Sequence, residues 1–96
     1  MEIIVERALK ARVRSSGEEI AVRVVIGRPH WTIDDTEAAC PLTIEGLYGE
    51  LVPIRGIDPL DALRNAIRMV ESLLSKVGDK YALYWADGEE YESATL

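Results

Sequence analysis

The chain has 96 residues, of which 48 % are hydrophobic and 29 % charged, and its formal net charge is −6. This length and composition are typical of a single soluble globular domain, here residues 1–96, and the net acidity argues against a general nucleic-acid-binding protein. One cysteine excludes an internal disulfide and favours a reducing compartment. The sequence contains neither a signal-peptide pattern nor a run of about 18 apolar residues. We therefore expect a cytoplasmic protein of bacterial type.

The first two segments, EIIVERALKARVR (residues 2–14) and IAVRVVIGRP (residues 20–29), alternate between apolar and polar residues. Period-two alternation on both sides of a short Ser-Gly turn predicts an antiparallel hairpin. One face of the hairpin is aliphatic: Ile3, Val5, Leu9, Ala11, Val13, Ile20, Val22, Val24 and Ile26. Arg7 interrupts this face, which indicates an edge or a bulge.

The opposite face of the hairpin carries a basic stripe of Lys10, Arg12, Arg14 and Arg23. Such a stripe can contact phosphate, but no aromatic residues interleave with it as they do in nucleic-acid-binding sheets. We therefore expect a solvated face, and we name Arg12, Arg14 and Arg23 as candidate contacts to a protein partner. Ala21 and Val25 fall on the same face, where an apolar patch would indicate a dimer.

The middle of the chain is interrupted by prolines. Pro29 and the Asp34-Asp35 pair predict a loop over residues 27–35. AACPLTIEG (residues 38–46) predicts a third strand with Cys40 on its inner face and Pro41 pointing outward. A short fourth extended piece is expected at residues 51–54.

The clearest element is a helix over residues 58–77. Asp58 is suited to the N-cap, Pro59 to the first helical position and Gly78 to the C′ position. Apolar residues occupy half of the helical wheel, which predicts a broad face packed on the sheet. YALYWA (residues 81–86) predicts a last strand, and residues 89–96 a flexible acidic tail. The fold class is α+β: an antiparallel sheet of four or five strands with one long amphipathic helix on one face.

The stretch GRPHWTIDDTEAACPLTI holds the only histidine and the only cysteine. His30, Asp34, Asp35 and Cys40 are metal-ligand types, but their spacings lack the pairs of a zinc site. Cys40 lies among aliphatic residues, where burial raises the pKa of a thiol and makes it inert. We expect no catalytic residue, metal or cofactor. Trp31 covers a core edge or anchors a partner, and we add it to the candidate partner contacts.

Three segments, ACPLTIEG, IRGIDPLDALRNAI and LYWADGE, resemble a family of small bacterial domains of unknown function, over roughly residues 38–88. The resemblance implies a compact α+β domain and brings no catalytic residues. We expect a non-catalytic interaction or accessory protein whose partner is another protein or a second copy. Three alternatives remain open: a ligand-binding domain with a cavity lined by Tyr81 or Trp85, a small enzyme using His30 and Cys40, and an immunity-type protein with an acidic face.

Overall fold

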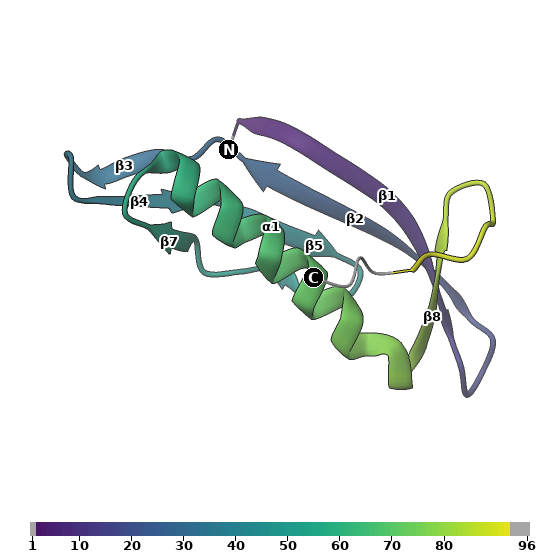
Figure 1. Ribbon diagram of the computed structural model, residues 1–96. Helices are drawn as coiled ribbons and strands as arrows, with labels where there is room; N and C mark the ends of the chain where they lie inside the picture. The colour runs from purple at the N-terminus through teal and green to yellow at the C-terminus, as the bar shows by residue number, and fades with distance from the viewer. Residues whose placement is uncertain (1, 93–96) are drawn as a thin grey trace.

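The structure, a computed structural model, describes residues 2–92 of the chain. This part forms two antiparallel sheets, a five-stranded one in the order β6-β5-β2-β1-β8 and a three-stranded one in the order β3-β4-β7 (Figure 1). The elements are β1 (Ile3–Val13), β2 (Glu19–Gly27), β3 (His30–Ile33), β4 (Glu37–Cys40), β5 (Leu42–Glu45), β6 (Gly49–Glu50), β7 (Ile54–Gly56), α1 (Pro59–Lys76), η1 (Val77–Asp79) and β8 (Tyr81–Trp85). The predicted α+β class with a five-stranded antiparallel sheet is confirmed, and the second sheet is additional.

The predicted hairpin is formed by β1 and β2, which pair from Arg12 opposite Glu19 to Ile3 opposite Gly27. Gly17 occupies the turn with a φ of 76°, a conformation that costs glycine little. The aliphatic faces of the two strands are buried from Leu9 onward in β1 and from Val22 onward in β2. The last strand, β8, pairs with β1 only between Leu9 and Val13.

The third predicted strand is two strands that belong to different sheets. β4 lies between β3 and β7, whereas β5 lies beside β2. Pro41 separates them because it has no N–H to continue a ladder. Its carbonyl oxygen accepts a hydrogen bond from Gly27 N–H at 2.9 Å. Cys40, Leu42 and Ile44 are all buried, so the predicted inner face is confirmed.

Two other sequence expectations were wrong in detail. The segment predicted as a loop contains β3, which pairs with β4 across a turn at Asp35, where φ is 59°. Aspartate tolerates this left-handed conformation, so the two acids close a hairpin and do not prevent a strand. Of the extended piece expected at residues 51–54, only Ile54 lies in a strand; residues 51–53 connect β6, which pairs with β5, to β7, which pairs with β4.

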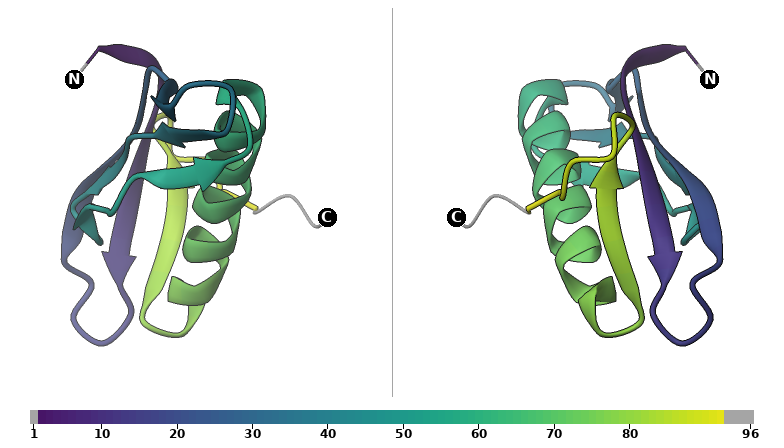
Figure 2. Two further views of the ribbon diagram at one scale, coloured as in Figure 1. Left: turned by 90° about the vertical axis from the view of Figure 1, so that its left-hand side faces the viewer. Right: turned by 90° about the vertical axis from the view of Figure 1, so that its right-hand side faces the viewer.

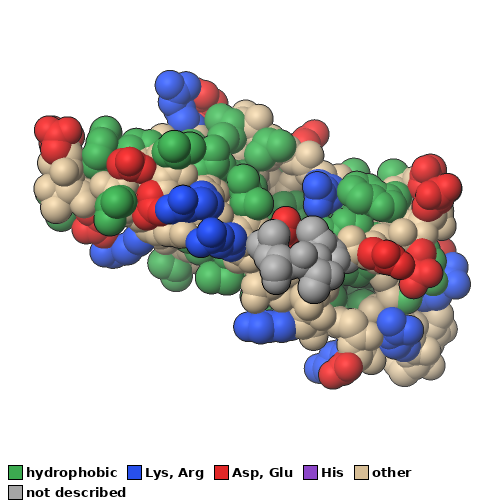
Figure 3. All heavy atoms as spheres, in the orientation of Figure 1, with side chains coloured by type: hydrophobic (Ala, Val, Ile, Leu, Met, Phe, Trp, Pro, Cys, Tyr) green, Lys and Arg blue, Asp and Glu red, His purple; other side chains and the backbone are tan. Residues whose placement is uncertain are grey.

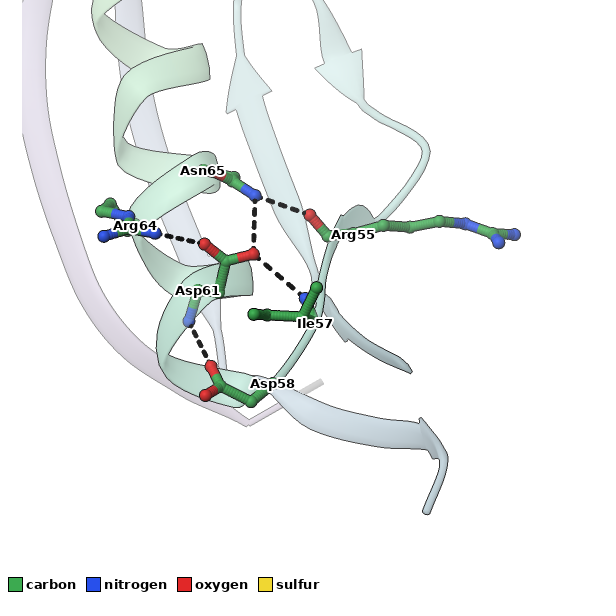
Figure 4. A network of polar contacts seen from close by, with 6 residues as sticks. All are labelled: Arg55, Ile57, Asp58, Asp61, Arg64 and Asn65. Carbon is green, nitrogen blue, oxygen red and sulfur yellow. Dashed lines mark hydrogen bonds and ion pairs between the residues drawn. The ribbon is translucent and has the colours of Figure 1, made fainter. Parts of the chain in front are cut away.

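The start of α1 is fixed by a network of polar contacts (Figure 4). Asp58 is the N-cap, as predicted, and its side chain accepts a hydrogen bond from Asp61 N–H at 2.7 Å. The Asp61 carboxylate accepts one from Ile57 N–H at 3.0 Å and pairs with Arg64. These contacts, the Ile57 N–H first and then Arg64, lower the pKa of Asp61. Asn65 donates to the Arg55 carbonyl oxygen at 2.9 Å, which ties the helix to β7.

The end of α1 differs from the expectation. Gly78 does not take the left-handed conformation of a C′ residue, because the chain tightens into the 3₁₀ turn η1 at Val77–Asp79. Tightening of the last turn is an alternative way to satisfy the helix's terminal carbonyl groups.

Only part of the predicted apolar half of α1 is covered. The helix packs on β4 and β7, and its buried residues form a narrow stripe: Ala62, Ala66, Val70 and Leu74. Leu60, Ile67 and Met69, which belong to the predicted half, are exposed. In both side views β8 lies between α1 and β1 (Figure 2). The helix therefore covers the small sheet and part of the large one, and the first half of β1 stays uncovered.

The segment expected as a tail packs against the fold as far as Tyr91. Tyr91 is buried, and its N–H donates to the Leu83 carbonyl oxygen at 3.0 Å. Its ring meets that of Trp85 edge-on, with centroids 5.0 Å apart. An aromatic ring gains enough from burial to order the residues around it. Residues 93–96 lie outside the described residues.

Candidate protein-interaction surface

Two of the four cations of the predicted basic stripe are paired with carboxylates of the chain. Arg23 pairs with Glu6 and lies 3.8 Å from Glu45, so three adjacent strands share one charge cluster. Arg12 pairs with Glu19 at 3.2 Å and lies 5.4 Å above the Tyr84 ring.

Arg14 completes this set of internal partners, because its Nε donates to the Gly78 carbonyl oxygen at 2.8 Å. Pairing of Arg12 and Arg23 with carboxylates reduces the positive charge that this face offers to phosphate. Partner binding through Arg12, Arg14 and Arg23 stays a prediction.

The same face does not carry the apolar patch that would indicate a dimer there. Ala21 is exposed, but Val25 is buried. An exposed apolar surface suited to a partner must therefore be sought elsewhere on the molecule.

His30 and Cys40 belong to paired strands but face opposite ways. His30 lies directly opposite Ala39, so these two side chains share one face of the small sheet and Cys40 points to the other. Cys40 is 0 % exposed, and its burial raises the pKa of the thiol, whereas His30 is exposed. The two residues do not form a nucleophile pair.

The other candidates from the same stretch are also dispersed. Among residues 2–92, no group of three or more His, Cys, Asp or Glu side chains is placed to hold a metal ion. Trp31 lies on β3 opposite Ala38, a fully buried residue, and is itself exposed. Its role in partner binding stays a prediction.

An uncovered strand edge lies in the first half of β1. Residues 2–8 are all exposed, and β8 begins to pair only at Leu9. Val13 N–H donates to Glu18 and Arg14 N–H donates to Lys80, so from Val5 onward odd-numbered residues of β1 bond toward β2 and even-numbered ones point toward the β8 side. By this alternation the backbone groups of Glu6 and Ala8 point away from β2, and no described strand pairs with them.

A shallow apolar groove runs beside this edge, between β1 and α1. It has a volume of about 200 Å³ and is lined by Val5, Glu6, Arg7, Val24, Ile26, Ile67, Val70 and Glu71. We call it the β1 groove. Val5 is 48 % exposed and Ile67 is 43 % exposed. Hydrophobic side chains gather over this region in the space-filling view (Figure 3).

The chain matches, over residues 5–95, the family described as "Domain of unknown function (DUF6968)". The chain belongs to this family. The resemblance to a family of unknown function, drawn from three segments, is thereby confirmed over a longer stretch than expected. No curated protein and no solved structure matches the chain. Within the described part of this DUF6968 domain, no helix is both long enough and apolar enough to cross a bilayer.

Arg7 closes the end of the β1 groove in this DUF6968 domain. Its Nη1 donates to the Tyr91 hydroxyl at 3.1 Å, and its guanidinium lies 5.1 Å above the Trp85 ring and 5.7 Å from the Tyr91 ring. The sequence indicated an edge or a bulge at this residue. Arg7 lies on the part of β1 that β8 does not pair with, whereas the shift in register lies between Ile3 and Val5 and not at Arg7. The groove itself was missed, because its helical wall was expected to be covered by the sheet.

Tyr81 lines hollows of about 540, 350 and 290 Å³ near the last strand and the end of α1. The hollow of about 290 Å³ also includes Arg14, Leu74 and Tyr91. A ligand cavity lined by Tyr81 or Trp85 stays a prediction.

Proposed function

We propose that this DUF6968 domain is a non-catalytic polypeptide-binding module. It accepts an extended segment of a protein chain along the first half of β1, with side chains of that segment in the β1 groove. The observation that carries the proposal is the coincidence of an unpaired strand edge, at Glu6 and Ala8, with an apolar groove on the core side of the same strand. The free Cys40 further supports a cytoplasmic location.

The two parts of this surface suit the two kinds of contact that an added strand makes. The free N–H and C=O groups of the edge bond to the main chain of the segment, and alternate side chains of the segment turn toward the groove. Natural proteins protect long exposed edges, so an edge next to exposed aliphatic side chains is a site for pairing.

The size of the groove favours a polypeptide over a small molecule. Sites for drug-sized ligands span about 300–1,000 Å³ and enclose most of the ligand. The β1 groove is smaller, about 200 Å³, and open. It has room for a few aliphatic side chains presented by a strand.

Site-specific photo-cross-linking tests the proposal. A benzophenone-bearing amino acid replaces Ile67, in the wall of the groove, or Val52, a 79 % exposed valine outside the groove lining, in the organism that encodes the chain. We expect a covalent adduct with a polypeptide from position 67 and little or none from position 52. Absence of an adduct at position 67, or equal adducts at both positions, contradicts the proposal.

A further inference from the structure

We infer that the polypeptide bound along β1 is a second copy of this chain, joined through antiparallel pairing of the two β1 strands with Val5 next to the two-fold axis. The inference rests on the proposed function and names its partner. Its support comes from the surface area of the domain, the length of the free edge and the charges along that edge.

The domain exposes more surface than its mass requires. A compact monomer of 10.7 kDa has about 5,500 Å² of accessible surface by the usual scaling with mass. This chain has 6229 Å² and measures 48 × 26 × 20 Å. The excess, about 700 Å², is close to the roughly 800 Å² that each partner contributes to a stable protein–protein interface.

The free edge also limits the assembly to a dimer. Pairing along β1 is available only N-terminal to Leu9, because β8 occupies the remainder. The opposite edge of the five-stranded sheet is β6, a strand of 2 residues. One long edge that is free over part of its length pairs once with its own copy and closes a two-fold dimer, whereas two long edges would propagate a filament.

The charges of β1 select the register. In an antiparallel pair, two residues directly opposite each other either exchange backbone hydrogen bonds or both direct their backbone groups away from each other. In a symmetric dimer, one residue must therefore lie directly opposite its own copy, and the two-fold axis passes between these two copies. An axis at Glu6 or at Arg7 would place like charges opposite each other, which is destabilising. An axis at Val5 places two valines opposite each other on the groove side.

The register centred on Val5 also uses the irregularity of β1. Ile3 pairs with Gly27 and Val5 with Ile26, so Ile4 has no opposing residue in β2. In the inferred register Ile4 lies opposite Glu6 of the second copy, and Glu6 lies opposite Ile4 of the second copy. The carboxylate of Glu6, which is paired with Arg23, lies opposite Ile4 in this register and not opposite another carboxylate.

Light scattering on the 96-residue chain tests the dimer. The expected mass is twice 10.7 kDa for the natural sequence. Val5→Glu places two carboxylates opposite each other at the axis and gives a folded monomer, as judged by circular dichroism. Val52→Glu is the matched control, an equally polar change at an exposed valine, and it leaves the dimer intact. A monomeric natural chain, or the same mass for both variants, overturns the inference.

Disulfide trapping tests the register. Opposed residues in a non-hydrogen-bonded pair have Cα atoms about 4.5 Å apart, which suits a disulfide. In a Cys40→Ala background, Val5→Cys gives a covalent dimer on mild oxidation and Ala8→Cys does not. Equal cross-linking of the two variants, or more from Ala8→Cys, rejects the axis at Val5.

The outcomes separate this inference from the proposed function. An adduct between position 67 and a second copy of the chain supports both. An adduct with a different polypeptide, together with a monomeric mass, leaves the binding module in place and removes the dimer. Absence of any adduct together with a monomeric mass removes both.

Discussion

Arg7 and Tyr91, which stand near opposite ends of the chain, are joined by a hydrogen bond of 3.1 Å from the guanidinium to the phenolic hydroxyl. The same guanidinium lies 5.7 Å from the centroid of the Tyr91 ring. This contact fixes the segment after β8 onto the core and closes the end of the β1 groove. The two residues therefore link the stability of the C-terminal segment to the shape of the candidate binding surface.

Replacement of Tyr91 separates the contributions of its ring and its hydroxyl. Tyr91→Phe removes the hydrogen bond and keeps most of the buried ring, so we expect a loss of about 1 kcal/mol in the free energy of unfolding. Tyr91→Ala removes the ring as well and should cost about 3–5 kcal/mol. Urea unfolding monitored by circular dichroism measures both. Equal stabilities for Tyr91→Ala and the natural chain would mean that the segment does not pack in solution.

Gly56 allows β7 to approach the helix closely. A Cβ atom at this position would lie 2.3 Å from the Ala62 nitrogen and 2.7 Å from the Ala62 Cα. We expect Gly56→Ala to destabilise the domain by about 1–3 kcal/mol or more, because backbone atoms cannot move aside as a side chain can. Thermal unfolding provides the measurement.

Gly78 provides the matched control for that substitution. Its Cβ position has no atom within 4 Å, and its φ is not in the left-handed region. Gly78→Ala should be neutral or stabilising by a few tenths of a kcal/mol, since alanine has less conformational freedom to lose on folding. Equal losses from the two substitutions would contradict the close approach of β7 to α1.

The parts of the fold that depend on local pattern could be predicted from the sequence. The hairpin follows from period-two alternation, and the start of α1 follows from Asp58 and Pro59, whose roles are local. Division of the segment around Pro41 between two sheets depends on which strands lie on either side of it. Pro41 marks the break, but the segment carries no signal of which strand each half pairs with, since both halves present the same inner face.

The candidate surface was less predictable for the same reason. The apolar half of α1 includes Ile67, and the sequence cannot distinguish a residue that packs on the sheet from one that borders an open groove. Arg7 was the available signal, as a charge on an otherwise apolar strand face. It indicated an edge but not what lies beside that edge, because Tyr91 reaches it from the other end of the chain.

The stability of the helix start should depend on acid pH through Asp61. Its carboxylate accepts the Ile57 N–H and pairs with Arg64, so its pKa in the folded state lies below the ordinary value of 3.8. A lowered pKa gives stability that is complete above the unfolded-state value and is lost as the pH falls toward the folded-state value. Asp61→Asn removes this dependence. The free energies of unfolding of the natural chain and the variant, measured as a function of pH, should therefore converge below about pH 4. A difference between them that stays constant down to the acid limit contradicts this assignment.

The thiol of Cys40 should react slowly in the folded protein. It is 0 % exposed, its Sγ lies 3.5 Å from the Gly27 carbonyl oxygen, and burial raises its pKa above the ordinary value of 9.0. Since the thiolate is the reactive form, both access and ionisation oppose labelling near neutral pH. The rate of reaction with a chromogenic disulfide reagent should rise by about 100-fold or more in denaturant, because labelling then no longer waits for an opening of the fold. A native rate close to that of the unfolded chain would place the thiol at the surface and restore Cys40 as a candidate nucleophile.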